Sequence, residues 1–133
     1  HVRSRRQRQM CIRDSYYGYL QNALLRSIRL VVDTGLHSQG WTRAQAIDYM
    51  LQNSAVTRED AEAEVDRYLA IPGQALAYKV GEMKISQLRE QAQRELGPRF
   101  DVRAFHTEVL KDGSVPLEIL QDKVQRWIAT QKG

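Results

Sequence analysis

The stretch RYLAIPGQALAYK, residues 67–79, decides how this chain of 133 residues is organised. Proline cannot continue the hydrogen-bond ladder of a preceding helix, but it fits the first turn of a new one. Pro72 and Gly73 therefore predict that one helix ends near Ala70 and that another begins at the break. Apolar residues at helical spacing then continue to Leu96, where the next Gly-Pro pair predicts a stop.

Upstream of this stretch, the spacing of apolar residues predicts three helices. The first covers residues 16–34, because its apolar residues recur every three or four positions and share one face. So much of its circumference is apolar that we expect it to be largely buried, with Gly35 as the left-handed residue just past its end. Thr42 with Gln45, and Thr57 with Asp60, are typical of residues that cap the next two helices.

Downstream, Asp101 is positioned to cap a short helix that ends at Gly113, and Pro116 opens a terminal helix. No segment alternates convincingly enough to predict a strand. The sequence therefore predicts an all-α fold, a compact bundle of about six helices joined by short connections.

Composition excludes several classes of protein. One cysteine and three histidines give neither an internal disulfide nor a zinc-finger spacing, and no apolar run is long enough to predict a transmembrane segment. The net charge of +4 comes from the first fifteen residues, which carry five arginines and Asp14, so residues 16–133 are formally neutral. We therefore expect no nucleic acid as a partner.

Residues 1–15 differ from the rest because they are basic and carry no helical or strand period. The string QMCIRDS, residues 9–15, resembles the translation of an adapter used in short-read sequencing libraries. We interpret residues 1–15 as a non-native or disordered arm and residues 16–133 as the C-terminal helical part of a larger domain.

Two groups of polar residues are candidates for chemistry. Around the Pro72 break lie Arg67, Tyr68, Gly73, Gln74, Tyr78 and Lys79. Free amides at a helix start favour an anion, so this corner could hold a carboxylate or an oxyanion. His37 follows Arg29 and Asp33 and could move a proton or donate to developing negative charge. On spacing alone, packing tyrosines and an ordinary ion pair between Arg29 and Asp33 are the favoured explanation of these residues.

Several strings, in the same order and at similar spacing, carry a resemblance to a known family. They are LVVDTGLH (30–37), GWT (40–42), RY (67–68), PGQALAYKVG (72–81), FH (105–106) and PL (116–117). Together they resemble the C-terminal part of the bacterial family called domain of unknown function 885, whose members look like all-helical zinc peptidases of the gluzincin type.

The resemblance implies a fold, a cofactor and roles for single residues. The chain would be about half of a larger metallopeptidase-like fold, because the family's His-Glu-x-x-His zinc helix lies upstream of the matching segment. No metal ligand is then expected in this chain, and zinc would be bound by the full-length parent. His37, Tyr68 and Tyr78 correspond to donors to the tetrahedral oxyanion, while Arg67, Gly73, Gln74 and Lys79 correspond to substrate-binding positions.

Two hypotheses about function follow. In the first, the chain is the substrate-side portion of a zinc-dependent peptidase, inactive alone, whose partners are a peptide substrate and the missing N-terminal half of the same protein. By family analogy the parent would be exported, to the periplasm or as a lipoprotein. In the second, the chain is a non-catalytic helical module that binds an anionic ligand or a protein partner.

Overall fold

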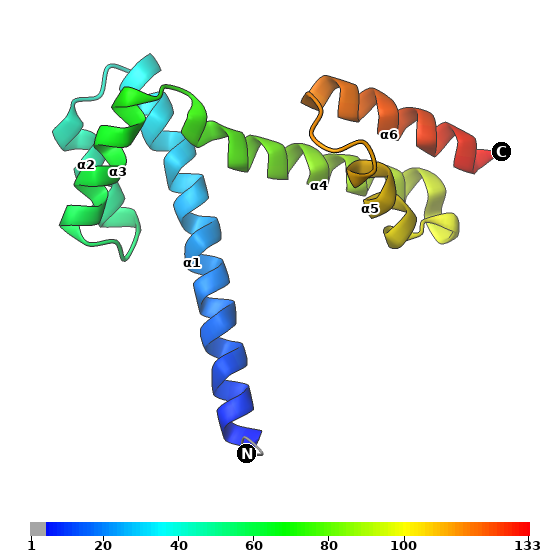
Figure 1. Ribbon diagram of the computed structural model, residues 1–133, viewed down its shortest axis with the longest axis horizontal. Coiled ribbons are helices and arrows are strands. Elements are labelled where there is room, and N and C mark those ends of the chain that lie inside the picture. Colours follow the sequence, from blue (N-terminus) through cyan, green and yellow to red (C-terminus); the bar gives the residue numbers. More distant parts are fainter. Residues whose placement is uncertain (1–4) are drawn as a thin grey trace. The chain divides into compact units, whose positions relative to one another are not determined.

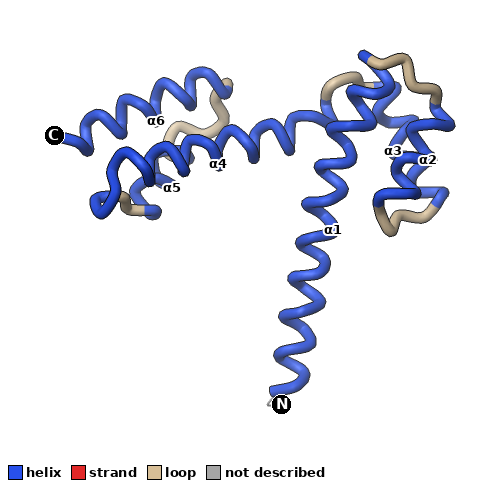
Figure 2. The backbone as a smooth tube through the Cα atoms, turned by 180° about the vertical axis from the view of Figure 1, so that it is seen from behind, coloured by secondary structure: helices blue, strands red, loops and turns tan. Residues whose placement is uncertain are grey.

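The computed structural model describes the backbone of residues 5–133 and the side chains from Ser15 onward. Over that range it is all-helical, with six α-helices and two short 3-10 turns and without a strand (Figures 1 and 2). The elements are α1 (Arg5–Ser38), α2 (Arg43–Asn53), α3 (Arg58–Ala70), η1 (Gln74–Leu76), α4 (Ala77–Leu96), η2 (Gly97–Arg99), α5 (Val102–Leu110) and α6 (Leu117–Lys132). The predicted fold class and the number of helices are confirmed.

The helices form two compact units, residues 1–79 and 80–133. In the first unit, α2 and α3 pack against each other and against the C-terminal part of α1. The core takes one stripe from each helix: Ile28, Val32 and Leu36 from α1, Ala46, Ile47 and Met50 from α2, and Ala61, Val65 and Tyr68 from α3. These residues recur every three or four positions, so each helix buries one face.

The second unit has its own core. It consists of Leu88, Ala92 and Leu96 from α4, Phe105 from α5, and Leu120, Val124 and Ile128 from α6. Val80 and Met83, which the sequence pattern placed along this helix, are 42% and 56% exposed. The residues of α4 that enter this core begin at Leu88.

The predicted helix caps are present. The Thr42 side chain accepts a hydrogen bond from the backbone of Gln45, whose own side chain returns to the backbone of Thr42. Thr57 caps α3 through the backbone of Asp60, and Asp101 caps α5. These contacts satisfy amide groups that the first turn of a helix leaves without partners.

The end of α1 differs from the prediction. The helix passes through Gly35 and ends at Ser38, and the left-handed residue is Gly40, with φ of 68°. Gly35 is there for a different reason. A Cβ atom built on it would lie 2.5 Å from Cε3 and 2.9 Å from Cε2 of the Trp41 indole, which packs directly on the helix backbone. The absence of a side chain lets the chain fold back onto α1.

The N-terminal part of α1 also differs from the prediction. The helix begins at Arg5 rather than near Tyr16, so it runs through most of the segment interpreted as an arm. The side chains of residues 1–14 lie outside the described part of the chain, and the interpretation of residues 1–15 as non-native stays a prediction. Leu20 and Leu24, expected to be buried, are exposed because α2 and α3 cover only the C-terminal part of α1.

Among the described helices, none combines the length and the apolar character that a membrane span requires.

Candidate functional site

Asp33 of α1 forms hydrogen bonds with the backbone of the Pro72–Gly73 corner. The backbone N–H of Gly73 lies 3.0 and 3.1 Å from the two carboxylate oxygens of Asp33, whose side chain is buried. Gly73 has φ of 81°, a conformation that glycine adopts without strain. The Pro72–Gly73 break and the buried Asp33 carboxylate of α1 therefore fix the start of η1 together.

Arg29, one helical turn before Asp33, holds the next residue of the corner. Its Nη2 atom donates to the side-chain oxygen of Gln74 at 3.0 Å. Its guanidinium lies over two phenol rings, 5.4 Å from the centroid of Tyr68 and 4.8 Å from that of Tyr78. The Arg29 side chain is buried, and its Nε atom has no hydrogen-bond partner among the described residues. The simple ion pair between Arg29 and Asp33 is thus replaced by two separate contacts to the corner.

Tyr68 is the most deeply buried of the predicted site residues. Its hydroxyl donates to the Glu64 carboxylate at 2.6 Å, and the same carboxylate oxygen lies 2.6 Å from the Arg67 guanidinium. Burial, followed by the bond to Glu64, holds the pKa of the Tyr68 hydroxyl far above its ordinary value. The hydroxyl is therefore protonated and engaged with Glu64.

The imidazole of His37 lies against the C-terminal end of α3. Its Nε2 atom is 3.1 Å from the backbone carbonyl oxygen of Tyr68 and 3.9 Å from Oδ1 of Asp33. A carbonyl oxygen can only accept, so this contact requires a proton on Nε2. The ring is partly exposed, and Nδ1 is the nitrogen that a ligand would meet.

Tyr78 is the predicted site residue with an exposed aromatic ring. It is 45% exposed, and the Arg26 guanidinium lies 5.1 Å from its ring centroid, in addition to that of Arg29. Lys79 follows it at the start of α4 and is partly buried. The structure thus brings His37, Tyr68, Gly73, Gln74 and Tyr78 together around Arg29 and Asp33.

Sequence reasoning missed Glu64 and misread Arg29. Glu64 precedes Arg67 by three residues and Tyr68 by four, so all three lie on one helix face. That spacing was visible and could have predicted the cluster. The contacts of Arg29 with Gln74 and Tyr78 join residues that are far apart in the sequence, and no local spacing signals them.

The described side chains, residues 15–133, contain no group of three or more His, Cys, Asp or Glu that could hold a metal ion. His37 and Asp33 are neighbours, but they supply only two potential ligands. The residues around the corner therefore do not fit zinc as a resident cofactor.

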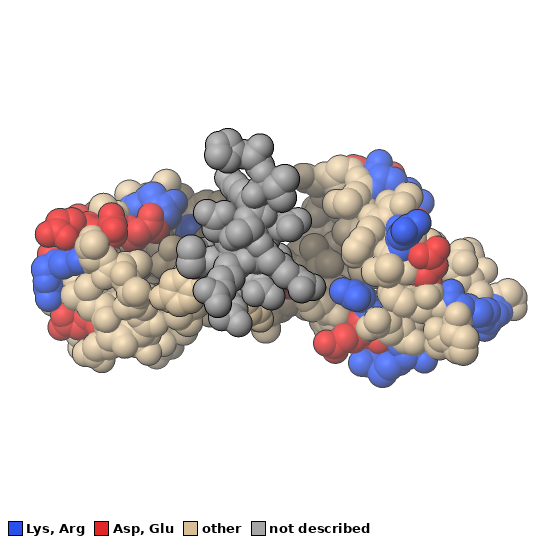
Figure 3. Space-filling model, turned by 90° about the horizontal axis from the view of Figure 1, so that it is seen from below, with Lys and Arg blue, Asp and Glu red and all other residues tan. Residues whose placement is uncertain are grey.

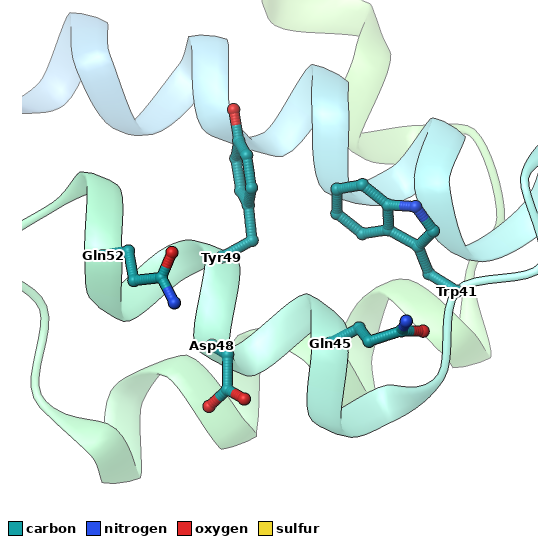
Figure 4. A pocket seen from close by; sticks show the side chains of 5 residues that line it. All are labelled: Trp41, Gln45, Asp48, Tyr49 and Gln52. Carbon is teal, nitrogen blue, oxygen red and sulfur yellow. The ribbon is translucent and has the colours of Figure 1, made fainter.

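Surface hollows also lie outside the corner, and one of them is at α2. A surface pocket of about 360 Å³ is lined by Trp41, Gln45, Asp48, Tyr49 and Gln52, all at the start of α2 or along it (Figure 4). On the face seen in Figure 3, Lys and Arg side chains are interspersed with Asp and Glu. A mixed surface of this kind is typical of a domain whose charge is nearly balanced.

The comparison with protein-family models identifies one family. Residues 11–124 match the family model described as "Bacterial protein of unknown function (DUF885)". A similar solved structure is "The crystal structure of the putative lipoprotein from Colwellia psychrerythraea", with a TM-score of 0.84 and 50% sequence identity. The match covers 85% of this chain and 19% of that one, so this chain spans about a fifth of the length of that relative. No curated protein matches the chain.

Proposed function

This chain belongs to the bacterial DUF885 family, and from that premise we propose that it is the C-terminal, substrate-side portion of a zinc-dependent peptidase. The zinc ligands of such an enzyme would lie outside the described residues, and zinc would supply the polarisation of the scissile carbonyl there. The role of this chain is to position the substrate and to stabilise negative charge.

The observation that carries the proposal is the exposed Tyr78 ring with two arginine guanidinium groups against it. A phenol hydroxyl is a good donor to an oxyanion, and nearby cations favour the charge that develops on that oxygen. Tyr78 is the proposed donor. Tyr68, whose hydroxyl bonds to Glu64, acts as a positioning residue beneath Arg29.

His37 is the second proposed donor. Its contacts with Tyr68 and Asp33 orient the ring, and a protonated imidazole could donate to the same oxygen. Arg67 and Lys79 remain the proposed partners of a substrate carboxylate. Arg67 is already paired with Glu64, so a substrate would have to compete with that ion pair.

One observation favours the alternative, a non-catalytic module that binds an anionic ligand or a protein partner. The hydrogen bonds of Arg26 go to Asn22 and that of Arg29 goes to Gln74, and all these acceptors are neutral. Guanidinium groups bonded to neutral acceptors keep much of their attraction for an anion. The same cluster would then bind a carboxylate without catalysing a reaction.

The name of the Colwellia relative suggests a place for the protein. That relative is called a putative lipoprotein, and we extend to this chain the proposal that its parent is exported. Further proposed partners are a peptide substrate and the N-terminal part of the same polypeptide.

The experiment measures zinc content and peptide hydrolysis in the longer polypeptide that contains this segment. Removing an oxyanion donor typically costs about a hundredfold or more in kcat. We expect the purified protein to contain zinc, and we expect Tyr78→Phe and His37→Ala each to lower kcat with little change in zinc content.

Tyr49→Phe is the matched control, because Tyr49 packs on Trp41 at the other side of α2 and should leave kcat unchanged. A protein without zinc and without hydrolysis would overturn the peptidase proposal and favour the anion-binding module. Zinc and activity that are untouched by both variants would remove Tyr78 and His37 from the chemistry.

A further inference from the structure

Two glycines lie inside α1, and only one has an explanation within the chain. Glycine in a helix interior lowers stability relative to alanine, but it lets another group approach the backbone closely. At Gly35 the approaching group is the Trp41 indole. At Gly18 a Cβ atom would meet nothing within 4 Å. The chain as described contains no group that requires a glycine at this position.

The side chains next to Gly18 are large, apolar and exposed. Tyr16, Tyr17 and Tyr19 are between 60% and 66% exposed, and Leu20 is 46% exposed. In Figure 1 this part of α1 extends beyond α2 and α3 of its own unit. Contiguous exposed apolar surface of this kind marks an interaction site more often than isolated apolar residues do.

Gly18 also lines a hollow between α1 and the connection from α2 to α3. The hollow measures about 410 Å³ and is lined by Tyr17, Gly18, Gln21, Asn22, Leu25, Ser54, Ala55, Val56 and Asp60. Leu25 and Val56 pack on the core of the first unit, while Gln21 and Asp60 supply polar groups at the rim. A segment that places an apolar side chain in the hollow and a polar side chain at its rim would fit this lining.

We propose that the face of α1 formed by Tyr17, Gly18, Gln21 and Leu25, with the adjoining hollow, is the contact face for an apolar segment of the same polypeptide outside residues 1–133. The segment approaches the α1 backbone at Gly18 and places an apolar side chain in the hollow. The argument for this occupant is length, because the chain covers 19% of the Colwellia relative at 50% identity. About four fifths of such a protein is available to cover this face.

The test uses the sign of a stability change. Gly18→Ala is made in the 133-residue chain and in the longer polypeptide, and urea unfolding is followed by circular dichroism. In the short chain, nothing opposes the added methyl group, so the midpoint should rise slightly, by up to roughly half a molar urea. In the longer polypeptide the methyl group would meet the docked segment, so the midpoint should fall. Gly81→Ala adds the same methyl group at another helix position with open space, and its effect on the midpoint is compared with that of Gly18→Ala.

The proposal is independent of peptidase activity, since its readout is stability. A midpoint that rises with Gly18→Ala in both proteins would overturn it. So would a short chain that sediments as a dimer and becomes a monomer on Tyr17→Glu, because a second copy would then be the occupant. A reversal of sign between the two proteins supports the proposal.

Discussion

The contact between Gly35 and Trp41 leads to a prediction with a defined sign. An alanine methyl group at Gly35 would sit 2.5 Å from Cε3 of the indole, whereas carbon atoms pack at about 3.5–4.0 Å. The indole or the helix must therefore move by roughly 1 Å, and overpacking of this kind costs about 1–3 kcal/mol. Alanine returns roughly 1 kcal/mol through its higher helix propensity. We expect Gly35→Ala to destabilise the first unit by up to about 2 kcal/mol.

The assay is urea unfolding, followed by fluorescence in a variant that contains a single tryptophan. The protein has two tryptophans, Trp41 in the first unit and Trp127 in the second. In a Trp127→Phe background, fluorescence reports the surroundings of Trp41 alone. The Gly35→Ala variant should unfold at lower urea, and its native emission should shift to the red as the indole leaves the helix.

A double-mutant cycle isolates the contact. In a Trp41→Ala background the added methyl group meets no ring, so Gly35→Ala should become neutral or stabilising by circular dichroism. The sign should therefore depend on the residue at position 41. If Gly35→Ala stabilises the chain as Gly18→Ala does, or if its effect is the same with and without Trp41, the reasoning from the close approach is refuted.

Two further predictions concern buried polar contacts. Tyr68→Phe removes a hydrogen bond to the Glu64 carboxylate and should cost about 1–2 kcal/mol in urea unfolding. Because the pKa of Tyr68 is raised in the folded chain, the wild type should lose stability as the pH rises above about 10, and the variant should lose less. Asp112→Asn should lower the thermal midpoint at neutral pH, since Lys123 is largely buried beside Asp112 at 2.6 Å. The close contact with Lys123 lowers the pKa of Asp112, so this loss should shrink as the pH falls below about 4.

The elements of the fold that depend on local chemistry could be predicted from the sequence. Caps at Thr42 and Thr57, the break at Pro72 and the stop at Gly97 all act within a few residues. A cap or a proline determines the backbone around itself, whatever the rest of the chain does. The predicted helix boundaries at these residues therefore agree closely with the structure.

The errors concern tertiary contacts. Gly35 was expected to end its helix because a glycine after an apolar run is typical of a helix end. In the structure the helix continues through Gly35, and the Trp41 indole packs against the backbone at that position, where a side chain would collide with it. Similarly, Val80 and Met83 stand at apolar helical spacing in α4, but both are exposed. Periodicity identifies the apolar face of a helix and leaves its partner undetermined.

The candidate site shows the same division between local and long-range contacts. Arg29 and Asp33 stand four residues apart, a spacing that predicts an ion pair. Each instead bonds to the Pro72–Gly73 corner, since the Asp33 carboxylate accepts from the Gly73 amide and the Arg29 guanidinium donates to the Gln74 side chain. Bonds across 40 and 45 residues thereby hold His37, Tyr68 and Tyr78 in one place.

This arrangement makes α1 the element on which the candidate site depends. Its residues Arg26, Arg29, Asp33 and His37 lie at intervals of three or four and face the corner, while its next stripe, Ile28, Val32 and Leu36, enters the core. The rotation of α1 about its axis therefore determines both which of its residues enter the core and which of them form the polar cluster. A shift of α1 about its axis, such as one forced at Gly35, would displace the groups that surround Tyr78, so stability and any activity of this site should change together.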